Sequence, residues 1–436
     1  MKRDFTILAL VIFIISFIVL LVDLPSLIFF HRDEINWIRV SRFSFNNFFI
    51  KRDFRNEGWG ESFRNFGLQN PQVGKYIIGG SLALQEYRDF EGVVAVFEGL
   101  KRNFERGTVP TAEEFYMARL PIALLSSATV TLVGILIMLI LCSLIKSKLL
   151  VFTGVFTGCL LFLTHPEVWK NSHRAMIDMP AIFFSTLAIV LIVNSFMLFN
   201  KKQFIKSLLL SAAAATSLGL SISTKMNAFL TWMAVVVAIV LMFVIVLLIY
   251  KTRRSDSIKY FSLYLVLQLV LPIAVFIGSN PFLYRNSFAN IKKMLQFSDI
   301  VISRRSNNPD IALYTLSEKA TTFGKIVFGG SIADLINNIV IEILFLTIGL
   351  LIVTITLVNN LRHKQANESN FIFLPLLIWF FVTCIGILIW SPVVYPRYYI
   401  PSIPSIAIFQ GVGFVYILLF IGQVSESIKR WRVERA

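Results

Sequence analysis

Residues 5–22 read FTILALVIFIISFIVLLV, and residues 30–34, a few positions later, read FHRDE. The first stretch is an uninterrupted apolar run of about 18 residues, the length that a helix needs to cross a bilayer. Asp33 and Glu34 therefore follow the end of a predicted membrane span, where hydrocarbon gives way to water. A carboxylate pair at that depth is a candidate functional site. The alternative is a solvated loop whose charge is balanced by Arg32.

The composition extends this interpretation to the whole chain. Its 436 residues are 56% hydrophobic and include 41 Phe, and the mean hydropathy is +0.74, more apolar than soluble domains usually are. The net charge is +16, but the basic residues lie between apolar runs and in loops, so we expect a membrane protein and no nucleic-acid partner. Cys142, Cys159 and Cys384 fall within apolar runs without paired spacing, which predicts neither a disulfide frame nor a metal site.

We therefore predict an all-α polytopic membrane protein with about ten transmembrane helices. The first run is long for a signal peptide and no small-x-small cleavage site follows it at residues 23–25, so we interpret it as a retained anchor. The predicted spans are residues 5–22, 118–145, 148–164, 178–199, 206–224, 226–250, 258–279, 337–359, 370–390 and 398–421.

The distribution of Lys and Arg predicts the orientation of these spans. Alternate connecting segments are basic, whereas the short segments between them carry few cations. Because the Lys/Arg bias of short loops sets membrane orientation, we expect an integral plasma (inner) membrane protein with both termini cytoplasmic. The basic segments contain Lys2 and Arg3, Lys146 and Lys148, Lys201, Lys202 and Lys206, residues 251–259, Arg362 and Lys364, and residues 429–432.

Two long loops, residues 23–117 and 280–336, are predicted on the extracytoplasmic side. Apolar residues recur at helical spacing through residues 90–104, with charged residues between them. That pattern suits a helix lying in the membrane interface, or a helix packed against the bundle. The second loop could be a lid or another interfacial segment. We expect no separate soluble domain, so that residues 1–436 form a single transmembrane domain.

With this orientation, several unusual charged residues meet on the outer face. Carboxylates and cations from separate spans, gathered on one side, suit a site for an anionic lipid head group and a reacting hydroxyl. The residues concerned are Asp33, Glu34, Lys75, Arg174, Asp178, Lys225 and Arg397.

Four short motifs follow one another along the chain: Asp33-Glu34 after the first span, Ala-Arg-Leu-Pro at residues 118–121, Arg-x-x-x-Asp-x-Pro at 174–180 and Arg-Tyr-x-x-Pro at 397–401. Their order resembles that of the C-type glycosyltransferases, in particular the branch of the protein O-mannosyltransferases and aminoarabinose transferases. A Pro-containing segment ending in Gly-Lys is matched by residues 70–75, NPQVGK, although a His-Pro-Pro start is more typical. The likeness covers nearly the whole membrane region.

The resemblance implies transfer of a sugar from a polyprenyl-phosphate donor to a hydroxyl acceptor, with inversion at the anomeric carbon. It implies Asp33 as the general base, while Glu34 or Asp178 would orient the acceptor or tune that base. A phosphate leaving group needs positive charge where negative charge develops. The residues expected to bind the donor phosphate are Lys75, Arg397, Arg174 and Lys225.

Three of these residues, and Arg119 in the Ala-Arg-Leu-Pro motif, also have a purely structural interpretation. Asp178 could cap the helix of the fourth span, since Pro180 lies in its first turn. Arg119 and Arg397 could be snorkelling anchors at helix ends, and Lys225 could mark a span boundary.

Histidines and aromatic residues near the same face leave further alternatives. His165, His173 and Glu167 lie close in sequence but lack a firm ligand pattern, so no cofactor is implied, and a divalent metal remains an alternative. Trp390, Tyr395, Tyr398 and Tyr399 fit an aromatic belt at the membrane surface better than a platform for stacking sugars.

Two functions from other classes compete with the transferase. A transporter or flippase of lipid-linked saccharides would need ionisable residues at mid-membrane and two related halves, whereas the predicted spans are largely uncharged at their centres. A non-catalytic assembly subunit is the other alternative, and the departure from His-Pro-Pro at residues 70–72 favours it. The sequence specifies neither the sugar nor whether the acceptor is a protein, a lipid or a glycan.

Overall fold

The structure is a computed structural model that describes residues 2–55, 70–84, 109–249, 254–328, 339–363 and 368–435. Within these ranges the chain is almost entirely helical, as predicted, and the β-type pairing described is a single bridge between Ala312 and Val393. The helix predicted over residues 90–104 lies outside the described residues.

The longer helices follow the apolar runs. Their bounds are α1 Lys2–Leu21, α7 Ala112–Leu144, α8 Lys148–Thr164, α10 Asp178–Asn200, α11 Phe204–Ile222, α12 Phe229–Ile249, α13 Arg254–Gly278, α16 Ile339–Arg362, α17 Glu368–Trp390 and α18 Ile403–Arg435. Shorter helices occupy the connections: α2 Arg32–Phe45, a π-helical turn η2 Asn46–Ile50, α5 Val73–Leu82, α9 Pro166–Ser172, α14 Ser287–Ser306 and α15 Leu316–Val327.

The predicted number of spans is confirmed. Among the described residues, nine helices are long and apolar enough to cross a membrane, and there are ten if α8 and α9, bent by 68° at His165, form one broken span. One boundary differs clearly from the prediction, because α7 begins at Ala112 rather than at residue 118. Thr111 caps that earlier start by accepting a hydrogen bond from the Glu114 amide.

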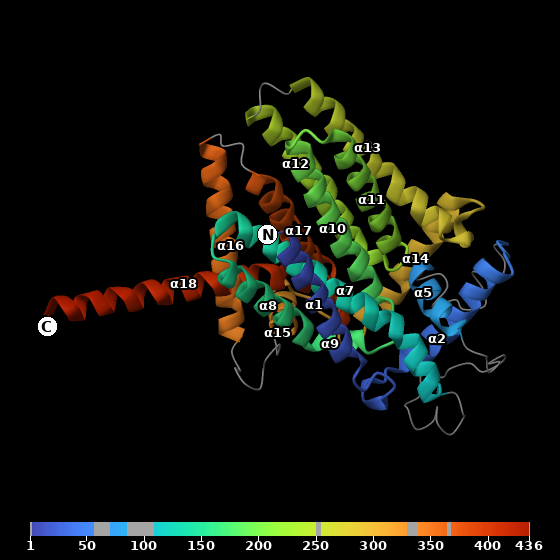
Figure 1. The fold of residues 1–436 in the computed structure, drawn as a ribbon. Coiled ribbons are helices and arrows are strands. Elements are labelled where there is room, and N and C mark those ends of the chain that lie inside the picture. The colour runs from blue at the N-terminus through green and yellow to red at the C-terminus, as the bar shows by residue number, and fades with distance from the viewer. Residues whose placement is uncertain are drawn as a thin grey trace.

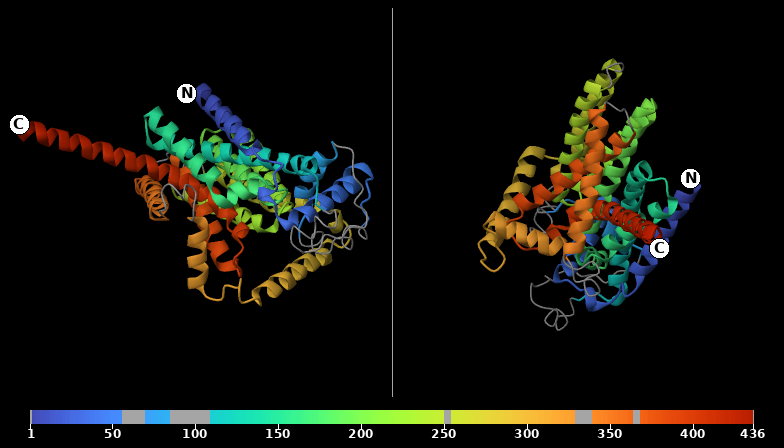
Figure 2. Two further views of the ribbon diagram at one scale, coloured as in Figure 1. Left: turned by 90° about the horizontal axis from the view of Figure 1, so that it is seen from below. Right: turned by 90° about the vertical axis from the view of Figure 1, so that its left-hand side faces the viewer.

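The spans pack as a bundle in which α10, α11 and α13 are neighbours and α17 contacts both α10 and α12 (Figure 1). α18 packs between α16 and α8 and then continues past the other helices, so that its C-terminal part extends away from the body (Figure 2). The backbones of α16 and α18 are in contact at Gly349. A Cβ added to this glycine would lie 1.9 Å from the Phe409 carbonyl oxygen, so no larger residue fits there. Small residues allow such close crossings between membrane helices.

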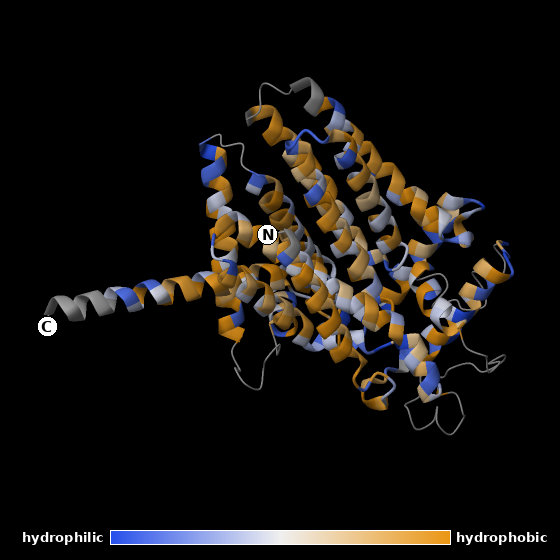
Figure 3. Cartoon of the chain, in the orientation of Figure 1, coloured by the Kyte–Doolittle hydropathy of each residue, from blue (hydrophilic) through white to orange (hydrophobic). Residues whose placement is uncertain are grey.

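Hydrophilic residues gather near the ends of the spans, and hydrophobic ones predominate along them (Figure 3). At one end of the bundle, Lys148 at the start of α8 pairs with Asp4 in α1, 2.9 Å apart, and Lys201 after α10 pairs with Glu368 at the start of α17, 3.4 Å apart. These are cations of the predicted cytoplasmic segments. The predicted site residues lie at the opposite ends of α1 and α10.

The two long loops contain ordered helices. The first holds α2, α5 and the first turns of α7, and α5 packs between α2 and α7. In the second loop, α14 and α15 flank a segment that pairs with the chain before α18, since the Leu313 amide donates to the Pro392 carbonyl at 2.9 Å and the Val394 amide to the Ile311 carbonyl at 2.8 Å. The second loop is thereby attached to the segment that leads to Arg397.

Candidate functional site

Glu34 and Arg119 form a buried ion pair at the end of the bundle opposite Lys148 and Lys201. Both side chains have no exposed surface. The guanidinium donates from Nε and Nη2 to the two carboxylate oxygens at 2.9 Å each, and from Nη1 to the carbonyls of Leu24 and Ser26 at 2.8 and 2.7 Å. This pair joins the chain after α1 to α2 and α7.

Glu34 has two further donors. Its carboxylate accepts the amide of Ala175 at 2.7 Å and that of His31 at 2.9 Å, the latter as part of the box that caps α2. A buried carboxylate that accepts this many hydrogen bonds from fixed groups is structurally constrained. Glu34 therefore fixes the positions of four segments of chain relative to one another.

These contacts correct one interpretation from the sequence. Arg119 lies within α7 and is fully buried, so it is not a snorkelling anchor at a helix end. The error follows from the boundary of the second span, because a helix that begins at Ala112 places Arg119 two turns inside it.

Asp33, the neighbour of Glu34, points to a different partner. Its Oδ2 accepts a hydrogen bond from Nη1 of Arg397 at 3.1 Å, although 364 residues separate the two in sequence. Asp33 lies in the first turn of α2, where the helix dipole favours a negative charge. Its side chain is 14% exposed and that of Arg397 is 23% exposed, so this pair, unlike Glu34–Arg119, is accessible.

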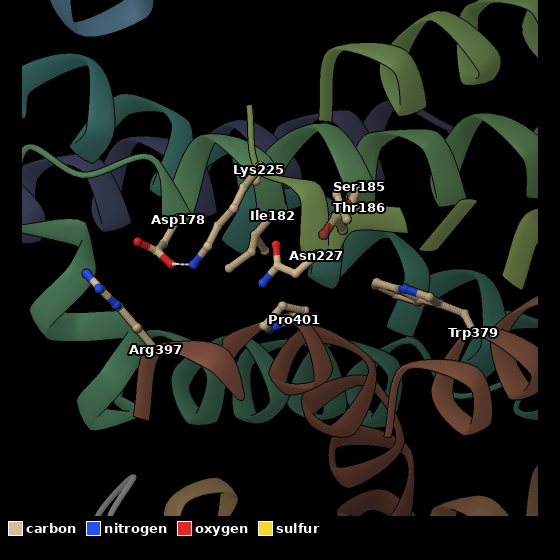
Figure 4. Close-up of a pocket in the computed structure, with 11 residues that line it drawn as sticks. Asp178, Ile182, Ser185, Thr186, Lys225, Asn227, Trp379, Arg397 and Pro401 are labelled. Atoms are coloured by element: carbon tan, nitrogen blue, oxygen red, sulfur yellow. Dashed lines mark hydrogen bonds and ion pairs between the residues drawn. The ribbon is translucent and has the colours of Figure 1, made fainter. Parts of the chain in front are cut away.

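Asp178 forms a second pair beside the first. Its carboxylate accepts a hydrogen bond from Nζ of Lys225, and Arg397 lies on its other side (Figure 4). Asp178 is the first residue of α10 and Ile177 is the N-cap, so the prediction that Asp178 caps this helix is wrong. Its side chain binds the lysine instead.

The four groups form a chain of alternating charge, in which Asp33 contacts Arg397, Arg397 lies beside Asp178, and Asp178 contacts Lys225. Their formal charges sum to zero. Each carboxylate is thus already neutralised, and an anion that binds here competes with a carboxylate for a cation.

A narrow pocket begins at this cluster and is lined by side chains of α10 and α17 and of the short turns that precede α12 and α18 (Figure 4). Asp178, Lys225 and Arg397 lie at one end of it, and Trp379 lies at the other. Between them the lining is mostly apolar, with Asn227 and the hydroxyls of Ser185 and Thr186 as its polar groups. The pocket therefore has a charged mouth and an uncharged interior.

Arg174 lies near Arg397. Its Nε donates to the Phe29 carbonyl at 2.8 Å, and the side chain is within electrostatic reach of Glu34 and Arg397. Burial lowers the pKa of Arg174, an effect that Glu34 opposes. The structure thus brings Arg174 close to the cluster, as predicted, and ties it to the connection between α1 and α2.

Lys75 differs from the other predicted cations because its side chain is fully buried in α5. Nζ donates to the Asn70 carbonyl at 2.8 Å, and burial lowers the pKa of Lys75 to about 7. The preceding Gly74 packs so closely that an added Cβ would lie 2.6 Å from the Ile177 side chain and 2.9 Å from that of Thr224. These are the chain neighbours of Asp178 and Lys225.

The atypical segment before Lys75 is also built into the fold. The Gln72 amide donates to Oδ1 of Asn280 at 2.9 Å, and the Gln72 side chain accepts the Ser44 hydroxyl at 3.0 Å. Gln72 thus connects the segment that follows α13 to α2 through hydrogen bonds.

Arg305 is a site neighbour that the sequence did not single out. Its Nη1 donates to the Tyr398 hydroxyl at 2.6 Å, and its guanidinium lies 5.1 Å from the centre of the Tyr395 ring. The Tyr398 ring in turn lies 5.4 Å from Nζ of Lys225. The signal in the sequence was the pair Arg304-Arg305 at the end of α14, which is also an ordinary place for basic residues.

The aromatic-belt interpretation fails for at least one residue. Trp390 is 60% exposed, as a belt residue would be, but Tyr399 is 1% exposed and lies in the core. Tyr398 contacts Arg305 and lies near Lys225 rather than forming part of a uniform ring of surface aromatics.

The two histidines near this end have other partners. His165 Nε2 lies 3.2 Å from the Val327 carbonyl oxygen, and His173 Nδ1 lies 2.8 Å from that of Trp169, with its ring stacked on Phe29. Within the described ranges no three His, Cys, Asp or Glu side chains come together as metal ligands.

Comparisons with known proteins agree with this architecture. A solved structure of ArnT from Cupriavidus metallidurans bound to undecaprenyl phosphate superposes with a TM-score of 0.50 at 15% identity, covering 94% of this chain and 59% of that one. The apo state of the same protein gives 0.49, with the same identity and coverage. The chain thus spans about three fifths of the length of these structures. No curated protein matches.

The profile of one protein family covers half of the chain. It is described as dolichyl-phosphate-mannose-protein mannosyltransferase and matches residues 64–282, which include Lys75, Arg174, Asp178 and Lys225. Together with the ArnT-like fold, this match confirms the resemblance to the C-type glycosyltransferases. The chain belongs to the dolichyl-phosphate-mannose-protein mannosyltransferase family.

Proposed function

We propose that this protein transfers a sugar from a polyprenyl-phosphate donor to a hydroxyl acceptor on the extracytoplasmic face of the membrane. The observation that carries the proposal is the contact between Asp33 and Arg397 beside Asp178 and Lys225, at the charged mouth of the pocket. Family membership and the likeness to a protein solved with undecaprenyl phosphate support a lipid-phosphate donor. The basic segments at the other end of the bundle support the assignment of the site to the extracytoplasmic side.

Arg397 and Lys225 are the groups that receive the donor phosphate. A guanidinium binds phosphate through two parallel hydrogen bonds, so the phosphate competes with Asp33 for Arg397. Once Arg397 turns to the phosphate, Asp33 loses its neutralising partner and becomes a stronger base. Donor binding thereby prepares the carboxylate for proton transfer.

The reaction is a single displacement. Asp33 accepts the proton of the acceptor hydroxyl while that oxygen forms a bond to the anomeric carbon, and the bond between that carbon and the phosphate oxygen breaks on the opposite side. The polyprenyl phosphate leaves as an anion stabilised by Arg397 and Lys225 and needs no proton. Attack and departure on opposite sides invert the anomeric carbon.

Asp33, not Glu34 or Asp178, is the base in this scheme because its side chain is the most exposed of the three, at 14% compared with 0% and 4%. Asp178 holds Lys225 and Arg397 in place. Glu34 is a positioning residue that acts through Arg119 and the Ala175 amide.

Lys75 and Arg174 supply further positive charge. Burial lowers the pKa of the Lys75 amine to about 7, and a negative charge nearby would favour its protonated form. Arg174 lies near Arg397 and adds to the positive potential there.

The test is mass spectrometry of lipid-linked sugars and of surface glycans in cells that lack the gene and receive either the wild type or the Asp33→Asn variant. We expect the deletion strain to accumulate a polyprenyl-phosphate sugar and to lack a glycan. Only the wild-type gene should reverse both changes. Full restoration by Asp33→Asn would remove Asp33 as the base. A vesicle counterflow assay separates the transferase from a flippase, which would move intact donor across the membrane.

A further inference from the structure

The last turn of α14 places Arg305 against two tyrosines of the segment that leads to α18. Its Nη1 donates to the Tyr398 hydroxyl at 2.6 Å, and its guanidinium lies 5.1 Å from the centre of the Tyr395 ring. The two rings contact each other edge to face, with their centres 5.7 Å apart and an angle of 85° between their planes. Arg305 is thus held by a hydrogen-bond acceptor and by an aromatic ring.

The partners of Arg305 differ in kind from those of the cations in the cluster. Arg397 and Lys225 each bind a carboxylate, whereas Arg305 forms no ion pair with any residue that the structure describes. A charge pair therefore does not explain why its guanidinium is directed at the tyrosines. Its hydrogen bond joins a positive charge to a neutral hydroxyl, and such bonds are stronger than those between two neutral groups.

Tyr398 connects Arg305 to the mouth of the pocket. The centre of its ring lies 5.4 Å from Nζ of Lys225 and 5.9 Å from Cζ of Arg397. A cation within about 6 Å of a ring centre is attracted by the negative potential of the ring face. One tyrosine therefore interacts with both cations to which the proposed reaction assigns the donor phosphate.

The orientation of the Tyr398 ring depends on its hydroxyl. The side chain is only partly buried, and its staggered rotamers point the ring in different directions. The hydrogen bond from Arg305 selects the rotamer in which the ring lies beside Lys225 and Arg397. Without that bond the ring can turn to other rotamers, and the two cations lose their common neighbour.

The second long loop sets the position of Arg305. Two of the 20 residues of α14 are buried, so packing along the helix contributes little to fixing its C-terminal end. The chain around that end is attached instead through the bridge between Ala312 and Val393 and through the Tyr314 hydroxyl, which donates to the Ser306 carbonyl at 3.3 Å. Arg305 and its tyrosines therefore lie on two segments that backbone pairing joins.

A phosphate that binds between Lys225 and Arg397 requires both side chains to be in place. Long cationic side chains have many rotamers, and ordering them on binding costs free energy that lowers the affinity. A ring that already lies beside both cations reduces this cost. Because the four charges of the cluster sum to zero, the affinity for phosphate depends on the geometry of the two cations rather than on an excess of positive charge.

We propose that Arg305 is a positioning residue for the donor phosphate, which holds Tyr398 in the orientation that keeps Lys225 and Arg397 ready to bind. Arg305 acts through the tyrosine and does not itself touch the phosphate. The inference rests on the proposed function, because it takes the cluster as the phosphate site. It extends that site to the second long loop.

The experiment measures equilibrium binding of undecaprenyl phosphate to the purified full chain in detergent. Arg305→Ala should weaken binding by about tenfold, the value of one hydrogen bond made by a charged group. Arg304→Ala removes the neighbouring arginine, which is exposed on the same turn of α14, and should bind like the wild type. Arg305→Lys keeps the charge and a donor, so it should recover most of the affinity.

A second variant distinguishes positioning from electrostatic attraction at a distance. Tyr398→Phe keeps the ring and the charge of Arg305 but removes the hydroxyl between them, so it should weaken binding as much as Arg305→Ala does. The double variant should bind no more weakly than either single variant, because both remove the same hydrogen bond. The thermal midpoints of these variants should equal that of the wild type, which a role confined to stability would not allow.

Two results would overturn the proposal. One is wild-type affinity in Tyr398→Phe, and the other is equal affinity of Arg305→Ala and the Arg304→Ala control. The proposed function is tested separately by sugar transfer in the wild type. A wild type that binds undecaprenyl phosphate but transfers no sugar would refute the transferase, while the role of Arg305 would still be decided by the binding of its variants.

Discussion

Asp33 and Glu34 are consecutive residues in the first turn of α2, yet they belong to two different regions of the molecule. Glu34 is buried with Arg119 and accepts hydrogen bonds from that guanidinium and from the amides of Ala175 and His31. Asp33 faces Arg397 at the mouth of a pocket, with part of its surface exposed. Successive residues of a helix point about 100° apart, so one turn can present one carboxylate to the interior and the other to a substrate.

Partner and burial, rather than residue type or position in a motif, distinguish the structural carboxylate Glu34 from Asp33, the carboxylate proposed as the base. A buried ion pair is costly to break, because the remaining charge is left without a partner. A partly exposed pair can exchange its partner for a ligand. The following predictions test this division, from the largest expected effect to the smallest.

Removing the charge of Asp33 should have the largest effect on activity. Asp33→Asn is expected to lower the rate of sugar transfer by about 10²–10⁴-fold, the usual contribution of a general base, and to leave the thermal midpoint unchanged. The rate is measured as sugar transferred by membranes that contain the variant. The substrate is the donor lipid that mass spectrometry of the deletion strain identifies. Asp4→Asn, at the other end of the bundle, is the control and should transfer at the wild-type rate. A normal rate for Asp33→Asn would contradict the assignment of Asp33 as the base.

Removing the charge of Glu34 should instead affect stability. Glu34→Gln leaves the Arg119 guanidinium buried without a counter-ion, so the free energy of unfolding should fall by about 3–5 kcal/mol. Thermal unfolding in detergent measures the loss. The same substitution at Glu368, which pairs with Lys201 where both side chains are nearly half exposed, should cause no measurable loss. If the two variants unfold alike, Glu34 is not a structural carboxylate.

Arg397 tests whether the accessible pair exchanges partners. Arg397→Lys keeps the charge but loses the planar guanidinium, and should weaken binding of undecaprenyl phosphate by about 10–100-fold, the value of one or two charged hydrogen bonds. Equilibrium binding to the purified protein measures this effect. Arg304→Lys, on the exposed side of α14, should bind like the wild type, and an unchanged affinity in Arg397→Lys would mean that phosphate binds elsewhere.

Lys75 gives the smallest effect, and it depends on pH. Its pKa is about 7 in the folded protein and 10.5 when unperturbed, so between these values the unfolded chain holds a proton that the folded chain lacks. Stability should therefore rise with pH across this window, by at most about 1.4 kcal/mol per pH unit. Lys75→Met should remove the rise, measured as the midpoint of thermal unfolding at pH 7.5 and 8.5. Lys170→Met, where the lysine side chain is 49% exposed, should keep it.

Much of the fold could be predicted because hydropathy is a local property. Apolar runs gave the number of spans, and the predicted all-α membrane class is confirmed. Boundaries were less predictable where a helix continues beyond its apolar run, as α7 does before residue 118, since the capping box at Thr111 extends it. That one error also misplaced Arg119.

Part of the candidate site was predictable for the same reason. Charged residues at the ends of spans come together when the spans pack, and Asp33, Arg397, Asp178 and Lys225 do so. The deep burial of Lys75 and the contact of Arg305 with Tyr398 were not predictable. They depend on the packing of α5 and on the path of the second long loop.

The sequence by itself determined that this chain spans a membrane many times and that its unusual charges lie at the ends of its spans, because both follow from which side chains tolerate hydrocarbon. Only the tertiary structure decided which carboxylate pairs with which cation. Asp33 meets Arg397 across 364 residues of sequence, while its neighbour Glu34 is enclosed with Arg119. The strength of a charge pair depends on distance and on exclusion of water, and both are set by the packing of segments that are remote in the chain.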